Sequence, residues 1–170
     1  MFYVSIFIYL IVVRLYELGL ARKNEAYQLK HGGILISDPY YHWIVFIHLL
    51  FLISLIVESY TSHQWQQSTP WLLFAIFIVL QLCRVYVIKT LGRLWNTKVI
   101  INPTNGERVT NGLFRWIKHP NYWIVFFEFI CLSLMFHAYM TAVIFPLLHV
   151  ALMTKRIPLE NRALSLYDEK

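Results

Sequence analysis

The feature that most constrains this chain is the alternation of long apolar runs with polar connections that carry its positive charge. Apolar residues dominate five runs, at about 2–20, 43–60, 71–91, 122–137 and 141–153. A run of about 20 apolar residues crosses a bilayer as an α-helix. Of the 170 residues, 58% are hydrophobic and 14% are charged, whereas about a quarter of a soluble domain is charged. We therefore predict an all-α membrane protein with five transmembrane helices in a single domain, residues 1–170.

The basic residues follow a strict pattern along these runs. Lys and Arg occur in the connections after the first and third runs and in the C-terminal tail, but are absent before the first run and after the second and fourth. Because basic connections stay on the cytoplasmic side, this predicts an outside N-terminus and a cytoplasmic C-terminus, in what we expect to be a bacterial cell membrane. Membrane lipids are the expected partners of this charge, and no nucleic-acid partner is predicted. The oligomeric state stays open.

The polar segment between the third and fourth runs is about thirty residues long. Residues 97–101 are rich in β-branched side chains, residues 102–106 carry a turn signal, and residues 108–110 are suited to a returning strand. This pattern predicts a small, cytoplasmic, β-hairpin-like insert between spans three and four.

The insert ends in a basic, aromatic stretch, residues 115–122, that leads directly into the fourth apolar run. Proline is best tolerated in the first turn of a helix, so Pro120 is expected to start that helix. The free N–H groups of the helix would then face the polar side beside Arg115, Lys118 and His119. Such an end favours an anionic or carboxylate-bearing ligand.

One ionisable side chain, Glu128, lies within the fourth apolar run. A charge there is costly in lipid, so Glu128 should face the protein interior. Asn121 lies seven residues earlier and therefore on the same helix face. Two alternatives follow for Glu128, either a functional carboxylate or a structural partner of Arg84 or His149.

A polar stripe leaves the membrane after the fifth run. His149, Arg156 and Glu160 are seven and four residues apart, which places them on one face of a helix. Arg156 would bind a carboxylate and Glu160 an amine or hydroxyl, the two groups of a free amino acid. The alternative is an ordinary Arg–Glu pair at a helix end. Pro158 lies between them and must either kink this helix or begin a new one.

Several kinds of site are not predicted. Cys83 and Cys131 lie inside apolar runs and are expected to pack as small hydrophobic residues. The histidines lack companions at metal-ligand spacing, so we expect no metal, and no glycine-rich nucleotide loop is present.

Two segments resemble a known signature. Residues 118–122 (Lys-His-Pro-Asn-Tyr) and, after an apolar hairpin, residues 156–161 (Arg-Ile-Pro-Leu-Glu-Asn) resemble the Arg-His-Pro-x-Tyr and Glu-Glu motifs of integral-membrane methyltransferases. Residues 91–99 and 109–115 are similar to the isoprenylcysteine carboxyl methyltransferase branch. The resemblance covers a core of about residues 84–161. Lys118 stands where the signature has arginine, and Asn161 stands where it has its second glutamate.

The resemblance implies transfer of a methyl group from S-adenosylmethionine to an oxygen of a lipophilic acceptor that enters from the bilayer. A prenylcysteine carboxylate and the hydroxyl of an alkylpyrone-type polyketide are the two acceptor classes that it implies. Arg156 or Arg115 would steer an anionic acceptor, and Glu128 or His119 would take the proton of a neutral one. The cofactor-binding residues expected from it are Gly112, Arg115, Lys118, His119, Pro120, Asn121, Tyr122, Glu160 and Asn161.

Two other functions remain open from the sequence. A membrane reductase of the sterol or steroid type shares a similar His-Pro corner but uses NADPH. A small proton-coupled transporter would use Glu128 as its titrating site.

Overall fold

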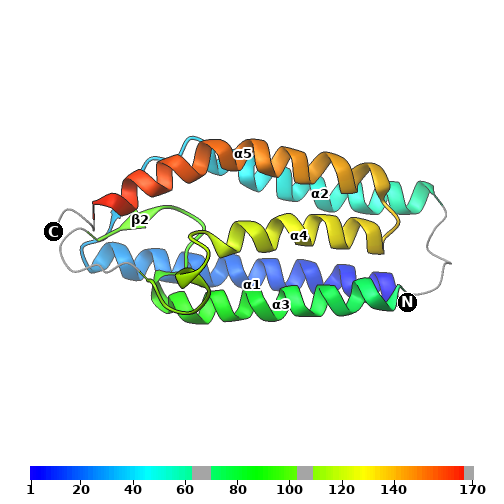
Figure 1. Ribbon diagram of the computed structural model, residues 1–170, viewed down its shortest axis with the longest axis horizontal. Coiled ribbons are helices and arrows are strands. Elements are labelled where there is room, and N and C mark those ends of the chain that lie inside the picture. Colours follow the sequence, from blue (N-terminus) through cyan, green and yellow to red (C-terminus); the bar gives the residue numbers. More distant parts are fainter. Residues whose placement is uncertain (63–69, 103–108, 167–170) are drawn as a thin grey trace.

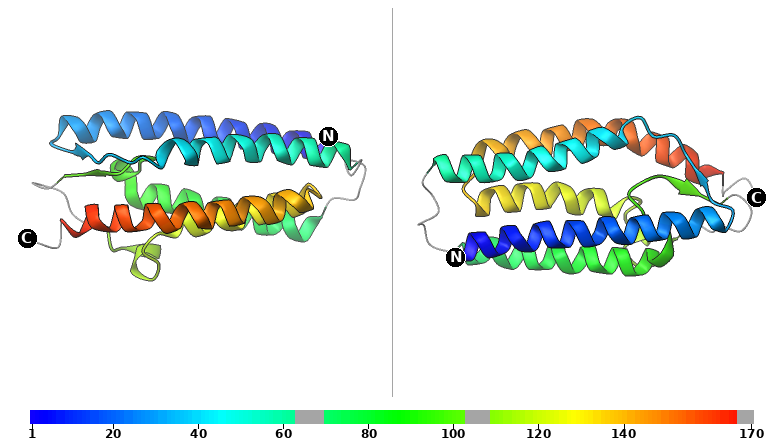
Figure 2. Two further views of the ribbon diagram at one scale, coloured as in Figure 1. Left: turned by 90° about the horizontal axis from the view of Figure 1, so that it is seen from above. Right: turned by 180° about the vertical axis from the view of Figure 1, so that it is seen from behind.

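Five long helices lie side by side in the computed structural model, which describes residues 1–62, 70–102 and 109–166 (Figure 1). Successive helices run in opposite directions, and the connection between α1 and α2 lies over one end of the bundle (Figure 2). The core lies where aromatic rings from α2, α4 and α5 meet, and the Phe51 and Phe129 rings stack with centroids 4.3 Å apart. The helices are α1 (Phe2–Lys30), α2 (Tyr41–Thr61), α3 (Trp71–Leu91), α4 (Pro120–Met135) and α5 (Tyr139–Ser165).

Four of the described helices, α1, α2, α3 and α5, are long and apolar enough to cross a membrane, which confirms a multi-pass membrane protein. The fourth helix in the chain, α4, has 16 residues, or about 24 Å at a rise of 1.5 Å per residue. This is shorter than a hydrocarbon core of about 30 Å. Helix length therefore supports four spans, and the fifth crossing stays a prediction.

Prolines act differently in α4 and α5. Pro120 occupies the first turn of α4, as predicted from the His-Pro junction. Pro146 and Pro158 both lie inside α5, which continues through them as one curved helix (Figure 1). Of the two alternatives for Pro158, the structure therefore excludes a new helix beginning there.

The prediction that residues 97–101 pair with residues 108–110 in a hairpin is wrong about the second strand. Strand β2 (Ile100–Ile101) pairs antiparallel with β1 (Ile34–Leu35), which follows α1, and not with residues 108–110. Val109 and Thr110 are not in a strand, and Arg108 lies outside the described residues. The sheet is continued by a hydrogen bond from the Ile36 amide to the Val99 carbonyl, 2.9 Å.

Helix α1 explains this pairing. Its Asn24 side chain donates to the carbonyl oxygens of Gly92 and Trp95, at 3.1 and 2.8 Å, and Gln28 donates to that of Arg93, at 2.8 Å. These amides hold the short 3₁₀ helix η2 (Gly92–Leu94) against the end of α1. The chain that follows η2 is therefore beside residues 34–36 and pairs with them.

Candidate active site

A cavity of about 270 Å³ lies at the end of the bundle where α3 ends and α4 begins. Small-molecule sites are commonly about 300 to 1,000 Å³, so this cavity is slightly smaller than that range. Its walls come from the first turns of α2 and α4, residues 94–101 and the C-terminal half of α5. His149, Arg156 and Glu160 all line it, so the predicted face of α5 does point into one site.

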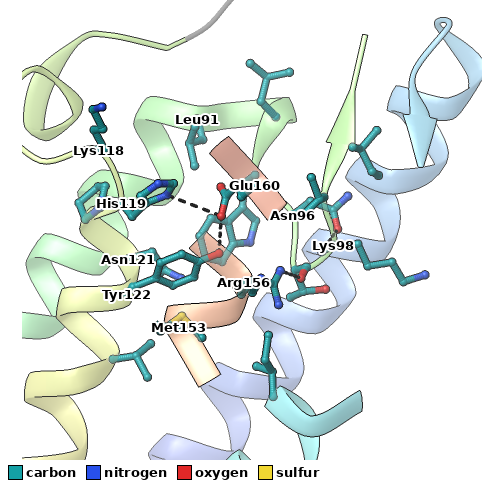
Figure 3. A pocket seen from close by; sticks show the side chains of 18 of the residues that line it. Leu91, Asn96, Lys98, Lys118, His119, Asn121, Tyr122, Met153, Arg156 and Glu160 are labelled. Carbon is teal, nitrogen blue, oxygen red and sulfur yellow. Dashed lines mark hydrogen bonds and ion pairs between the residues drawn. The ribbon is translucent and has the colours of Figure 1, made fainter. Parts of the chain in front are cut away.

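The Glu160 carboxylate is held by two residues of the His-Pro junction (Figure 3). The Tyr122 hydroxyl donates a hydrogen bond to it, and His119 Nδ1 lies 3.6 Å from the same oxygen. His119 Nε2 in turn lies 3.0 Å from the amide oxygen of Asn161. Because both ring nitrogens of His119 face oxygen atoms, the arrangement suits a protonated imidazole that donates on both sides.

The Arg156 guanidinium is buried one turn before Glu160. One terminal nitrogen donates to the Thr97 carbonyl oxygen at 2.6 Å, and the other lies 3.5 Å from the Asp38 carboxylate. Its centre lies 6.0 Å from the centroid of the Tyr122 ring. Asp38 was not predicted as a site residue. Nothing in the sequence indicates that it reaches a residue more than a hundred positions later.

Four buried polar atoms that belong to cavity-lining residues have no hydrogen-bond partner within the described part of the chain. They are Trp95 Nε1, Asn96 Nδ2, Arg156 Nε and Asn121 Oδ1. Buried polar groups are nearly always paired, so these three donors and one acceptor are available to a ligand. Trp95 and Asn96 were not predicted as site residues. Their only sequence signal is their position within the segment 91–99.

Most predicted cofactor residues do line the cavity, whereas three do not. Those that line it are Lys118, His119, Pro120, Asn121, Tyr122 and Glu160. Asn161 reaches the site through His119. Arg115 is exposed, and its guanidinium lies 5.6 Å from the Trp116 ring. Gly112 has a positive φ of 61°, and a Cβ there would come within 2.5 Å of the Tyr86 hydroxyl oxygen. The positive φ therefore favours glycine at position 112, and a larger residue would also have to displace the Tyr86 side chain.

Glu128 is buried beside the site, without lining the cavity. Its carboxylate accepts hydrogen bonds from Arg14 at 2.7 Å, Arg84 at 3.0 Å and Gln81 at 2.6 Å. Both arginines also pair with Glu17, the Arg14 nitrogen at 2.9 Å. The structural alternative, a pair with Arg84, is thus present in the molecule. We call Arg14, Glu17, Arg84 and Glu128 the buried charge cluster.

The sequence matches the isoprenylcysteine carboxyl methyltransferase (ICMT) family over residues 71–166, from the start of α3 through α5. The chain belongs to this family. The resemblance inferred from the His-Pro and Arg/Glu segments is thereby confirmed. ICMT membership implies a membrane methyltransferase, and the methyltransferases of this family generally use S-adenosylmethionine.

Two bacterial proteins resemble the chain over nearly its whole length. The uncharacterized protein YpbQ of Bacillus subtilis is 37% identical over 162 residues, covering 95% of each chain. An uncharacterized protein of Haemophilus influenzae is 27% identical over 157 residues, covering 92% of this chain and 91% of that protein. No solved structure matches the chain. The likeness to these relatives includes α1 and α2, which supply Glu17 and His48 to the cavity wall.

Proposed function

We propose that this protein transfers a methyl group from S-adenosylmethionine to an oxygen, either a carboxylate or an acidic hydroxyl, of a lipophilic acceptor drawn from the bilayer. The observation that carries the proposal is that Glu160 and Arg156 both line one cavity. A carboxylate and a guanidinium one helical turn apart are complementary to the amine and carboxylate of a zwitterionic amino acid.

The residues present fit such a cofactor. Arg156 keeps Nε free for a carboxylate, while Asp38 and Thr97 fix the rest of its guanidinium. The unpaired donors on Trp95 and Asn96 are suited to ring nitrogens and ribose oxygens. When bound, the cofactor supplies a methyl group on a positively charged sulfur. The protein's contribution is to orient both reactants and to exclude water, which accounts for much of the rate of such a transfer.

The acceptor is proposed to reach the cavity from the membrane. Ile44, His48, Val125 and Met153 line the cavity and belong to helices of the bundle, so this half of the site lies among membrane-spanning segments. A prenylcysteine and an alkylpyrone-type polyketide both carry a polar head on an apolar chain that would suit it. The bacterial relatives favour a bacterial cell membrane as the location.

Direct binding of S-adenosylhomocysteine to the purified protein tests the proposal. We expect binding to the wild type and an affinity about 10- to 100-fold lower in Glu160→Gln, because a charge-assisted hydrogen bond contributes about 1.5–3 kcal/mol. Arg162→Gln is the matched control, since this exposed residue lies two positions further along α5.

The same titration with NADPH addresses the reductase alternative. Membership of the ICMT family argues against a reductase. Binding of NADPH without any binding of S-adenosylhomocysteine would overturn the methyltransferase proposal.

A further inference from the structure

Two histidines, His48 and His149, line the part of the cavity that is far from Glu160, and the proposed cofactor site gives them no role. His149 precedes Glu160 by eleven residues on α5, which is about 16 Å along the helix axis. His48 approaches from α2, and both residues line the cavity. Both rings contact the buried Phe129 ring, with centroids 5.2 Å from it for His48 and 5.7 Å for His149. Two imidazoles therefore lie together in the half of the cavity formed by membrane helices.

The backbone fixes which nitrogen of each ring carries a proton. His149 Nε2 lies 3.0 Å from the Tyr122 carbonyl oxygen, and His48 Nδ1 lies 2.8 Å from that of Ile44. A carbonyl oxygen can only accept, so each of these nitrogens must donate. In the neutral rings the opposite nitrogens, Nδ1 of His149 and Nε2 of His48, are acceptors. Neither has a hydrogen-bond partner among residues 1–62, 70–102 and 109–166.

The two bases expected from the sequence are already engaged. Both ring nitrogens of His119 face Asn161 and Glu160. Glu128 accepts from two arginines and a glutamine, so it has little capacity to take a further proton. His149 and His48 are therefore the cavity-lining imidazoles whose acceptor nitrogens are free in the described structure.

The charged residues around the two histidines also affect whether a carboxylate or a hydroxyl can bind beside them. Arg14 and Arg84 are close enough to His48 to act on it electrostatically, and both belong to the buried charge cluster. That cluster contains two arginines and two glutamates, so it is formally neutral and leaves no free cation. A carboxylate can only accept hydrogen bonds, and two acceptor nitrogens would repel it. A hydroxyl would donate to them.

We propose that His149, with His48 beside it, forms the subsite for the acceptor's reacting group, and that this group is a protonated hydroxyl on an apolar chain. The inference rests on the proposed methyl transfer and chooses between its two acceptor classes. In the reaction the acceptor oxygen forms a bond to the methyl carbon, the carbon–sulfur bond breaks with its electron pair going to sulfur, and the hydroxyl proton moves to Nδ1 of His149. The sulfur loses its positive charge as the imidazole gains one, so the net charge of the cavity is unchanged.

The chemical nature of the product provides a test that needs no variant. Wild-type protein is incubated with methyl-labelled S-adenosylmethionine and a total lipid extract of its host, and the labelled lipid is treated with mild alkali. A methyl ether survives this treatment, as the inference requires. A methyl ester releases labelled methanol, which would overturn the inference and leave the proposed methyltransferase function intact. Failure of both labelling and S-adenosylhomocysteine binding would instead refute the proposed function.

Substitution of His149 by glutamine tests the role of the ring. The Gln amide retains a donor for the Tyr122 carbonyl but has no basic nitrogen. We expect turnover to fall about 100-fold or more, the usual contribution of a general base, with S-adenosylhomocysteine affinity and KM for the acceptor lipid within about twofold of wild type. His42→Gln is the matched control, because His42 is exposed at the start of α2 and does not line the cavity.

The pH profile separates a proton acceptor from a merely structural residue. As the pH rises toward the ionisation of the acceptor's own hydroxyl, the base is no longer needed, so the rate of His149→Gln should approach that of the wild type. A packing defect would give the same deficit at every pH. Such a constant deficit, or full activity of His149→Gln at neutral pH, would overturn the inference.

Discussion

The contribution of an ion pair to the stability of this protein depends on whether the pair is buried or lies near the surface. The carboxylate of Glu128 is 1% exposed and is paired with two arginines, whereas Glu25 pairs with Lys98 at 2.7 Å near the surface. Water stabilises the separated partners of a surface pair almost as well as the pair itself. Inside the bundle nothing replaces a missing partner, so removal of one charge leaves the others unpaired.

Replacement of Glu128 by glutamine should therefore lower the free energy of unfolding by about 3–5 kcal/mol, the usual cost of breaking a buried ion pair. The measurement is unfolding of the purified protein in detergent micelles. Glu25→Gln is the control and should change the free energy of unfolding by less than about 1 kcal/mol.

Equal stability losses in the two variants would show that Glu128 is not in a buried ion pair. If Glu128 instead serves as a base or a transport site, Glu128→Gln would abolish activity while leaving stability close to wild type.

Among the structural elements, the turn from α1 into β1 positions one wall of the cavity. Strand β2 and the residues before it form a cavity wall, and β1 is the strand that holds β2 in place. The turn brings the chain close to itself at Gly33, where a Cβ would lie 2.7 Å from the Gln28 carbonyl oxygen. That contact is with backbone, which cannot move aside as a flexible side chain can.

Gly33→Ala is thus expected to displace β1 and β2 and to weaken S-adenosylhomocysteine binding several-fold, with a lower melting temperature. Gly19→Ala is the matched control, because a Cβ at Gly19 meets nothing within 4 Å. In a helix interior that change is neutral or stabilising by up to about 1 kcal/mol. Binding by Gly33→Ala that equals the control's would contradict the role of this sheet as a fixed wall.

Taken as a whole, the molecule has two distinct ends. The cavity lies at one, together with the start of α4 and the C-terminal part of α5. At the other, the Glu58 carboxylate near the end of α2 accepts hydrogen bonds from the Met140 and Thr141 amides, at 2.7 and 2.8 Å, and so caps α5. Helix α4 runs from the cavity toward the second end (Figure 1). With 16 residues it is short for a span, so a fifth crossing stays a prediction.

Cysteine labelling in intact cells tests this orientation. In a background with Cys83 and Cys131 replaced by alanine, Met140→Cys should react with a membrane-impermeant maleimide from outside. Arg115→Cys should react only after the cells are permeabilised, because the basic connections are expected in the cytoplasm. The reverse pattern would contradict the orientation, and labelling of both positions from outside would contradict a fifth crossing.

Much of the candidate site could be predicted from local sequence. The His-Pro junction starts a helix because proline restricts its own backbone, and His149, Arg156 and Glu160 share a face because of helical periodicity. Those rules act over a few residues, so they needed no knowledge of the fold. The apolar runs likewise determined a multi-pass helical protein, and the ordered motifs indicated the family.

Tertiary structure alone decided which distant residues meet. The sequence did not predict that Asp38 would reach Arg156, that β1 would replace residues 108–110 as the partner of β2, or that Arg14 and Glu17 would join Arg84 and Glu128. Each of these contacts joins segments more than 60 residues apart and depends on how the helices pack. A local pattern fixes the direction in which a side chain leaves its helix, whereas the partner that it meets depends on packing across the whole bundle.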